Sequence, residues 1–213
     1  MIKKLLLISL WLLHGFPGSA LAADLRGITI QVEFIEVKHS DLTDLIFDKP
    51  FESDSGKLRK QIQEKVRNRD ADIIDTVVIR TRDTVRTNTV SADQIKYPVN
   101  YDVTGAAGFE IQNAGIFVRV EPLITEDKKT ILLNIFSEFS ERIADADYGN
   151  NAKGVRVIQP QFHKARMETS LLVTDGTYSF AGTARLNKAY NKNREDPIVM
   201  VFVRAMINQS DEN

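Results

Sequence analysis

Alternating apolar and polar residues predict β-strands along most of the chain. From Ile28 to Phe34 every second residue is apolar, which is the period of a strand with one buried face. At Phe34-Ile35 the apolar positions shift by one residue, as a β-bulge would require. The segment 197–207 is apolar at nearly every position, so we expect a final strand that is buried on both faces.

The second half of the chain predicts two hairpins. Residues 116–121 and 131–140 alternate on either side of a polar turn at 126–129, which is typical of an antiparallel pair. Residues 167–173 also alternate, and Asp175-Gly176 follows them as a two-residue turn signal before 178–180.

Turn-forming residues predict where the other strands end. A β-branched run at 71–80 and a Thr- and Val-rich run at 84–95 predict two strands, separated by a turn at 81–83 and ended by Tyr97-Pro98. The small residues 105–108 predict a short connection. The Asp-, Asn- and Gly-rich segment 144–154 predicts the longest loop, and 187–196 predicts a second polar loop.

One amphipathic helix is predicted between the first two strands. Leu58, Ile62 and Val66 recur at four-residue spacing within 57–68, so one narrow apolar stripe should face a sheet, with Ser53 or Ser55 as N-cap. A shorter helix is expected after Ser40 or Asp41. The basic residues of the main helix, Arg59 included, are expected to form a solvated face rather than a nucleic-acid surface.

The N-terminus has the organisation of a secretory signal peptide. Lys3 and Lys4 precede an apolar run from Leu5 to Leu13, and Ser19-Ala20-Leu21-Ala22 supplies the small residues of a cleavage site. We therefore expect a signal peptide at 1–22, cleavage after Ala22, and a single domain at 23–213. The leader contains two Lys and no acid, so its removal shifts the net charge from −1 to −3, and we expect no nucleic-acid partner.

Composition leaves little room for catalysis. The chain has 43% hydrophobic residues and no Cys, so it can bury a core but has no disulfide, thiolate metal site or Cys nucleophile. After cleavage the histidines are His39 and His163, each expected to be exposed or locally hydrogen-bonded. The common hydrolase and zinc-protease motifs do not occur. We predict no catalytic, cofactor or metal site.

The order of the β elements resembles the secretin homology domain. The apolar-Glu pattern of 32–37 is similar to the opening of that core, and the hairpin of 115–124 and 131–140 is similar to its "Gly, strand, Pro, turn, strand, Glu, Ser" hairpin. Residues 166–176 with Phe180-Ala181-Gly182 are similar to its Asp-Gly hairpin, and 196–207 stand where its last apolar strand would be. The likeness runs in the same order from Ile28 to Ile207.

The resemblance implies a fold, a role and partners. Secretins are ring-forming outer-membrane channels of type II and type III secretion and type IV pilus systems. The expected fold is α+β, predominantly antiparallel β, a secretin-like core with one main helix packed on the sheet. The expected role is structural or in assembly, without enzymatic activity, in the periplasm or at the outer membrane, with copies of itself or envelope proteins as partners and a possible peripheral outer-membrane association.

A second hypothesis is a free-standing periplasmic or surface β-rich binding or adhesion module, which an all-β sandwich lacking the packed helix would favour. Under either hypothesis, exposed strands and turns are where partner contacts concentrate. The candidate contact residues are Arg80, Arg82, Arg86, Asp175 and Gly176.

Overall fold

The computed structural model describes residues 26–47, 54–102, 105–152, 154–185 and 197–208. Its elements, in chain order, are β1 (Gly27–Lys38), α1 (His39–Phe47), α2 (Gly56–Arg67), β2 (Asp72–Arg82), β3 (Thr87–Asp102), β4 (Gly105–Ile124), β5 (Thr130–Asn150), β6 (Arg156–Thr174), β7 (Tyr178–Arg185) and β8 (Pro197–Ile207). The predicted signal peptide and the predicted 187–196 loop lie outside the described residues.

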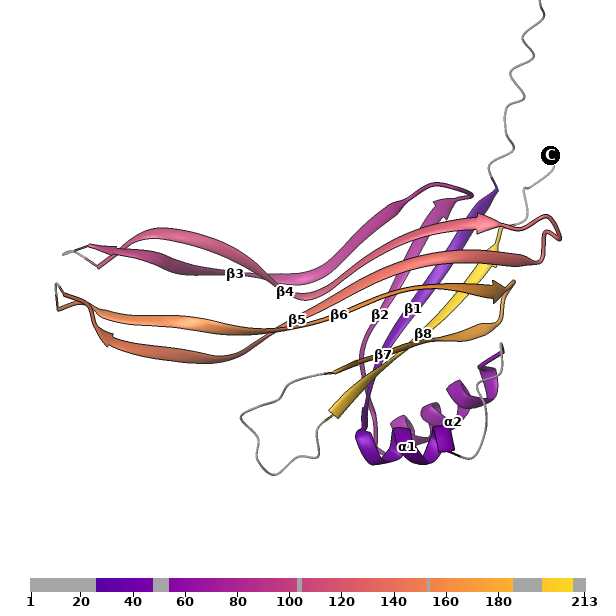
Figure 1. The fold of residues 1–213 in the computed structure, drawn as a ribbon, viewed down its shortest axis with the longest axis horizontal. Coiled ribbons are helices and arrows are strands. Elements are labelled where there is room, and N and C mark those ends of the chain that lie inside the picture. The colour runs from indigo at the N-terminus through magenta and orange to yellow at the C-terminus, as the bar shows by residue number, and fades with distance from the viewer. Residues whose placement is uncertain (1–25, 48–53, 103–104, 153, 186–196, 209–213) are drawn as a thin grey trace, which may run out of the picture.

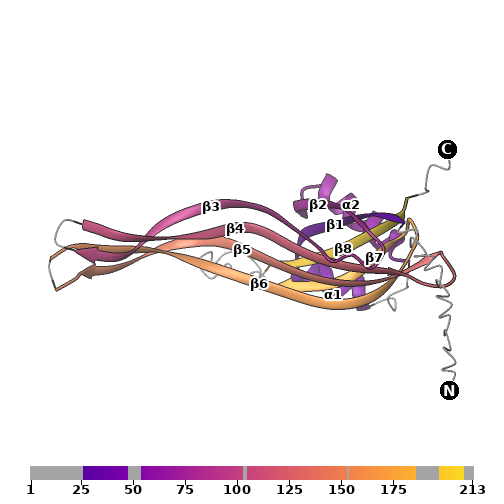
Figure 2. The ribbon, with the colours of Figure 1, turned by 90° about the horizontal axis from the view of Figure 1, so that it is seen from above.

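The strands form two antiparallel four-stranded sheets. The first, sheet A, has the order β2-β1-β8-β7, and the second, sheet B, has the order β3-β4-β5-β6. Figures 1 and 2 show that sheet B is much longer than sheet A and extends well beyond it, whereas α1 and α2 lie on the other side of sheet A. The expected α+β fold, predominantly antiparallel β, is confirmed.

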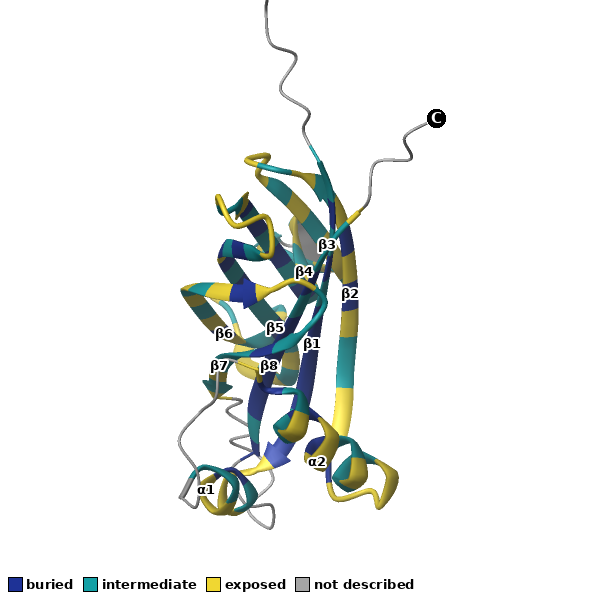
Figure 3. Cartoon of the chain, turned by 90° about the vertical axis from the view of Figure 1, so that its right-hand side faces the viewer, coloured by how far each residue is buried: buried dark blue, intermediate teal, exposed yellow. Residues whose placement is uncertain are grey.

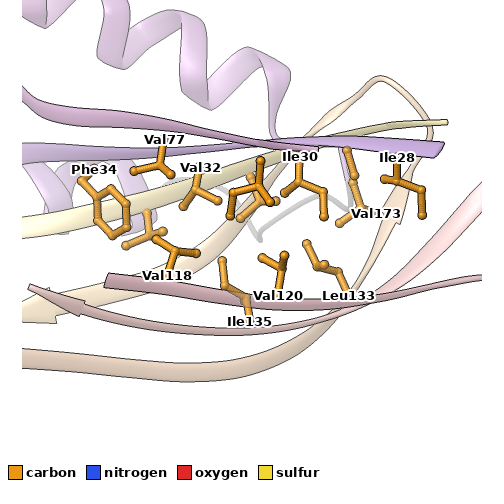
Figure 4. Packing of buried hydrophobic residues seen from close by; sticks show 14 of the residues in the cluster. Ile28, Ile30, Val32, Phe34, Val77, Val118, Val120, Leu133, Ile135 and Val173 are labelled. Carbon is orange, nitrogen blue, oxygen red and sulfur yellow. The ribbon is translucent and has the colours of Figure 1, made fainter. Parts of the chain in front are cut away.

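The main core lies between the two sheets. Ile28, Ile30 and Val32 of β1 point toward Val120 of β4 and Leu133 of β5 (Figure 4), and all five are fully buried. Each of these strands buries every second residue here. The alternating pattern of the sequence therefore predicted correctly which side of β1 and of β5 faces the sandwich core.

A smaller core lies between sheet A and the helices. Ile62 of α2 and Leu42 of α1 pack with Ile35, Met200 and Phe202 of sheet A. The prediction of one main helix packed on the sheet through its 58/62/66 stripe is confirmed, so the helix-free sandwich that would favour an adhesion module is not observed. Ser55 is the residue before α2, but its hydroxyl accepts a hydrogen bond from the Phe180 backbone N–H rather than capping the helix.

Strand β8 occupies the centre of this three-layer arrangement. It pairs with β1 on one side and β7 on the other, and it buries Val201 and Val203 toward sheet B and Met200 and Phe202 toward the helices. Figure 3 shows β1 and β8 as the most continuously buried strands. The expectation of a strand apolar on both faces is confirmed.

The shift in the apolar pattern of β1 has a different cause from the predicted one. A register irregularity does occur at Phe34/Ile35, but Ile74 of β2 is the unpaired residue, and the pairing of β1 with β8 is continuous. The pattern changes because the helices cover the second face of β1 from Glu33 onward, so that Ile35 and Val37 are buried as well. The bulge therefore belongs to β2.

Several predicted strand ends are wrong. Strand β3 continues past Pro98 to Asp102, because its pairing with β4 continues, and β3 is an edge strand that tolerates a proline. The expected connection at 105–108 is the start of β4, and most of the expected 144–154 loop belongs to β5. The predicted turn residue Arg82 is the last residue of β2.

The predicted Asp-Gly hairpin is also wrong. Strand β6 belongs to sheet B and β7 to sheet A, and the two are not paired with each other. Asp175 and Gly176 lie between them, so this turn carries the chain from one sheet to the other. Local turn chemistry cannot distinguish such a crossover from a hairpin.

The β4–β5 turn is organised by the carboxylate of Asp127. It accepts hydrogen bonds from the Thr125 hydroxyl (2.6 Å), the Lys129 N–H (2.9 Å), and the N–H (3.0 Å) and hydroxyl (2.7 Å) of Thr130. These bonds stabilise the ionised form, so the pKa of Asp127 lies well below its ordinary value, with the Thr125 bond as the largest cause.

We expect Asp127→Ala to lower the melting temperature at pH 7. A depressed native pKa contributes stability above the carboxyl's ordinary pKa of 3.8, and this stability is lost progressively as the pH falls below it. The difference from the wild type should therefore shrink in thermal melts recorded from pH 4 downward. Glu126→Ala, at the neighbouring exposed position, is the control. A difference in melting temperature between Asp127→Ala and the wild type that did not change with pH would contradict this expectation.

Candidate functional site

Sheet B divides into two separate hairpins beyond the sandwich. The β4–β5 pairing ends at Gly115↔Ser140, whereas β3–β4 pairing continues to Asp102↔Gly105 and β5–β6 pairing continues to Asn150↔Arg156. We call 93–102 with 105–114 the first arm, and 141–150 with 156–164 the second arm. Figure 1 shows both arms extending away from sheet A and the helices.

The arms have no hydrophobic core. None of the residues described in 91–114 and 141–164 is buried. The two arms contact each other through Tyr97 and Phe162, with ring centroids 5.9 Å apart, and the Tyr101 hydroxyl donates to the Ile158 carbonyl (2.9 Å). An isolated two-stranded hairpin is at best marginally stable in water, so these few contacts leave both arms weakly supported.

The arms also expose large apolar side chains. Phe109 is 51% exposed, Ile111 62% and Tyr148 67%. Phe109 and Ile111 lie on alternate positions of β4, and Lys96 lies 4.5 Å from the Phe109 ring. Exposed apolar side chains on a sheet with open edges often mark a contact with another chain.

One ion pair joins the two strands of the second arm, and another lies within β5. Arg156 donates to Asp147 (2.5 Å) and Arg142 donates to Asp145 (2.6 Å). The Arg156 bond holds the pKa of the Asp147 carboxyl below its usual range. On the first arm, partial burial and the hydrogen bond to Glu110 raise the pKa of Tyr97. The Asp147–Arg156 and Tyr97–Glu110 contacts therefore each join the two strands of one arm.

Two of the proposed contact residues lie on a free edge of sheet A. Arg80 and Arg82 are exposed at alternate positions of the edge strand β2, on the face opposite to the sandwich core. The exposed Val78 precedes them on the same face, at 59% exposure. The structure thus brings two of the predicted residues together at an open sheet edge.

The other predicted contact residues have structural roles in this fold. Arg86 is exposed, but its guanidinium forms an ion pair with Glu121 of sheet B (2.8 Å). The Asp175 carboxylate accepts the Ile207 N–H (2.8 Å), and the Gly176 N–H donates to the Ala205 carbonyl (2.8 Å). Asp175 and Gly176 therefore attach the crossover turn to β8.

The sequence patterns do not predict the arms, which extend away from sheet A (Figure 1). The pattern of 109–114, now part of β4, predicts no element, and that of 144–154 predicts a loop. The available signal was the placement of Asp147 and Arg156 on either side of Asn- and Gly-rich residues, which fits a hairpin tip with a cross-strand ion pair.

The two histidines agree with their expected surroundings. His39 is exposed, and the His163 Nε2 lies 3.1 Å from the Arg185 carbonyl oxygen. In the described part of the chain, no group of three or more His, Asp or Glu residues is arranged to hold a metal ion. Among those same residues, no helix is long and apolar enough to cross a membrane.

No protein-family model and no curated protein sequence matches the chain, but solved secretin structures match its fold. The type IV competence pilus secretin PilQ of V. cholerae matches 89% of this chain and 63% of its own at 10% identity, with a TM-score of 0.53. The type II secretion system secretin GspD of E. coli K12 matches with 13% identity and a TM-score of 0.46. The SPI-1 type III secretion injectisome secretin InvG of Salmonella matches with 11% identity and a TM-score of 0.46.

The match is one of fold. This chain is covered to 88% by GspD and to 89% by InvG, and it spans 51% and 67% of their chains. At 10% identity the PilQ likeness supports a shared arrangement of strands and helices, without assigning an activity. The resemblance to secretins found in the sequence is thus supported at the level of the fold.

Proposed function

We propose that this protein is an exported, non-enzymatic secretin-like protein with a structural or assembly role in a type II or type III secretion or type IV pilus apparatus at the bacterial outer membrane. In this proposal a signal peptide at 1–22 is cleaved after Ala22, and 23–213 act as one domain in the periplasm or at the outer membrane. The partners are copies of itself or envelope proteins.

The pair of arms without a core is the observation that carries this proposal. The arms expose Phe109 and Ile111, and sheet B ends in two edge strands, β3 and β6. Such a surface promotes aggregation of a monomer. In an assembly it can form the interface, because neighbouring chains cover it. The fold shared with the PilQ secretin adds support.

Arg80 and Arg82 are proposed as a second contact, at the β2 edge of sheet A. Their guanidinium groups suit acidic groups of an envelope partner. Asp175 and Gly176 are proposed to act indirectly, by fixing the turn that joins the two sheets. Arg86 is also proposed to act indirectly, by holding the β2–β3 connection to sheet B through its ion pair with Glu121.

Self-assembly can be tested with a double variant of the first arm, Phe109→Ser with Ile111→Ser. Both side chains are more than half exposed, so the monomer should keep its stability within about 0.5 kcal/mol, whereas the high-mass species should decrease. Light scattering after size-exclusion chromatography in mild detergent measures the amounts of the monomer and of the high-mass species. Val85→Ser, at 40% exposure next to the β2–β3 turn, is the control.

A wild-type protein that stays monomeric at every concentration tested and never co-purifies with envelope proteins would refute the proposal. Because the chain contains no Cys, Ile111→Cys also gives an unambiguous cross-linking site. The Ile111→Cys variant, with the rest of the chain unchanged, should form disulfide-linked dimers if the first arms of neighbouring chains lie close together.

A further inference from the structure

Two arginines without a counter-charge lie at one corner of the helix-side face of sheet A. Arg80 and Arg82 are exposed on the edge strand β2, and neither forms an ion pair with another described residue. Helices α1 and α2 lie at the opposite end of this face (Figure 3). The two guanidinium groups therefore form an open, positively charged surface.

Asn208, which follows β8, is attached to the same corner. Its N–H donates to the Gly27 carbonyl (2.8 Å), and its Oδ1 accepts from the Thr29 hydroxyl (3.1 Å). Strand β1 lies between β8 and β2, and its register with β2 places Gly27 opposite Arg82 and Thr29 opposite Arg80. Asn208 is therefore held in the rows of sheet A that contain the two arginines.

Gly27 leaves the space between Asn208 and Arg82 open. A Cβ added at Gly27 would lie 2.9 Å from the Asn208 Nδ2, so the Asn208 carboxamide lies over β1 at a position without a side chain. The backbones of β8 and β2 are two strand spacings apart, about 10 Å. Three residues of extended chain span about 10 Å, so residues 211 and 212 can reach the side chains of β2.

The segment 209–213, which lies outside the described residues, has the complementary charge. Its sequence is Gln-Ser-Asp-Glu-Asn, with two acids and no base. Arginine forms strong, often bidentate, hydrogen bonds with carboxylates. A short connection to the site also gives these acids an effective concentration on the order of millimolar. The observations therefore favour an occupant from the same chain.

We propose that the segment 209–213 crosses β1 at Gly27 and pairs Asp211 and Glu212 with Arg80 and Arg82. In this position it covers the surface proposed above for the acidic groups of a partner, which must displace it. This regulation rests on the proposed partner contact, whereas the docking of the segment requires only the monomer.

Paramagnetic broadening of backbone amides in NMR spectra of the full chain tests the docking. Because the chain contains no Cys, Asn213→Cys takes a single nitroxide label. We expect broader amide signals for Arg80 and Arg82 than for Gly176 and Tyr178. The latter two lie beside β8 on its other side, so a segment without a preferred position would reach them at least as easily.

Neutralising the acids should abolish the difference between the two sides of β8. The labelled variant Asp211→Asn with Glu212→Gln keeps the size of both side chains and removes their charge. Raising the salt to about 0.5 M should reduce the broadening at β2 by about twofold or more, because salt screens exposed ion pairs. The variant Arg67→Ser with Arg69→Ser removes two exposed arginines near the end of α2 and is the matched control, which should leave the difference unchanged.

A charge exchange distinguishes recognition from a structural effect. Arg80→Glu with Arg82→Glu should abolish the excess broadening at β2, and adding Asp211→Lys with Glu212→Lys to the same chain should restore it. Restoration requires direct pairing, because both sets of changes leave the opposite charges facing each other.

Displacement by an acidic ligand is measured with a hexa-aspartate peptide as the probe. The amide shifts of β2 should reach half-saturation at a peptide concentration about twofold to tenfold lower in Asp211→Asn with Glu212→Gln than in the wild type, because two exposed ion pairs no longer compete. Asp44→Asn with Glu64→Gln, on the exposed sides of the helices, removes the same charge and is the control. Equal concentrations for the wild type and the neutral segment would contradict the regulation.

Equal broadening on both sides of β8 in the wild type, or no restoration by the charge exchange, would overturn the docking. Broadening of an isotope-labelled chain by a nitroxide on a second, unlabelled chain would assign the arginines to another copy and would also overturn it. Neither result affects self-assembly through the arms, and a protein that stays monomeric can still show the docked segment. The two proposals therefore fail independently.

Discussion

Replacing Glu33 with leucine is expected to lower the free energy of unfolding by about 3–5 kcal/mol, because it leaves the Arg59 guanidinium buried without its counter-charge. Glu33 is 4% exposed and Arg59 9%. The Arg59 Nε donates to the Glu33 carboxylate. The ion pair joins β1 to α2 on the helix side of sheet A.

A network of polar groups surrounds this ion pair. The Glu33 carboxylate also accepts from the Gln31 amide (2.8 Å), and Arg59 donates from Nη1 to the Gln63 side chain (2.9 Å). The Tyr178 ring centroid lies 5.8 Å from the guanidinium of Arg59 and 5.6 Å from that of Arg204. With its hydrogen bonds satisfied, the network fixes where α2 lies on the sheet.

Urea unfolding followed by circular dichroism measures the effect. The double variant Glu33→Leu with Arg59→Met should recover most of the lost stability, because an apolar pair of similar size needs no counter-charge. Arg86→Met, which breaks the exposed pair with Glu121, should cost no more than about 1 kcal/mol. If Glu33→Leu cost as little as Arg86→Met, the network would have to be accessible to water.

The Arg59 network illustrates what sequence patterns could not predict. The prediction that Arg59 belongs to a solvated helix face is wrong. Periodicity identified the side of α2 that carries Leu58 and Ile62, and Arg59 follows directly on the edge of that stripe. No feature of the basic residues of α2 distinguishes the one that meets a buried Glu, since the partner is 26 positions away in the chain.

The sandwich was predictable because its central strands β1, β4, β5 and β8 bury at least one face where the two sheets pack together. Alternation in β1 and β5, and the continuous apolar run of β8, follow directly from contact with one or two neighbouring layers. The packed helix was predictable for the same reason. Hydrophobic periodicity reports burial within the chain, and these elements are buried within the chain.

The arms were not predictable, because burial within the chain does not shape their sequence. The second arm contains Glu141, Arg142, Asp145 and Asp147, and no described residue of it is buried. Alternation is therefore weak, and turn-forming residues dominate the pattern. Of the contact candidates, Arg80 and Arg82 were placed on an exposed edge, whereas the bonds that Asp175 and Gly176 make with β8 depend on a crossover that local sequence cannot reveal.

The branch point of the two arms depends on Gly115. Its φ is +148°, and a Cβ added there would lie 2.3 Å from the Ser91 carbonyl oxygen and 2.5 Å from the Ala92 Cα on the neighbouring strand β3. Both obstructing atoms belong to the backbone, so no side-chain movement relieves the contact. In the direction of the arms, Gly115 is also the last residue of β4 that pairs with β5.

We therefore expect Gly115→Ala to lower the free energy of unfolding by about 2–5 kcal/mol, which combines backbone strain of about 1–3 kcal/mol with a similar cost of overpacking. Urea unfolding measures the loss. Gly149→Ala is the matched control, because its φ is +74° with no atom within 4 Å of the added Cβ, and only the left-handed strain of about 1–2 kcal/mol applies.

Hydrogen exchange separates a local effect at the branch from a general loss of stability. In Gly115→Ala, amides of 93–102 and 105–114 should exchange faster by a larger factor than those of β1 and β8, because β3 and β4 must move apart at Ala92↔Gly115. A uniform increase, or a stability loss no larger than that of Gly149→Ala, would contradict this role. If the arms form the contact between neighbouring chains, Gly115→Ala should also reduce the high-mass species, whereas Gly149→Ala at the tip of the second arm leaves the branch and the first arm unchanged.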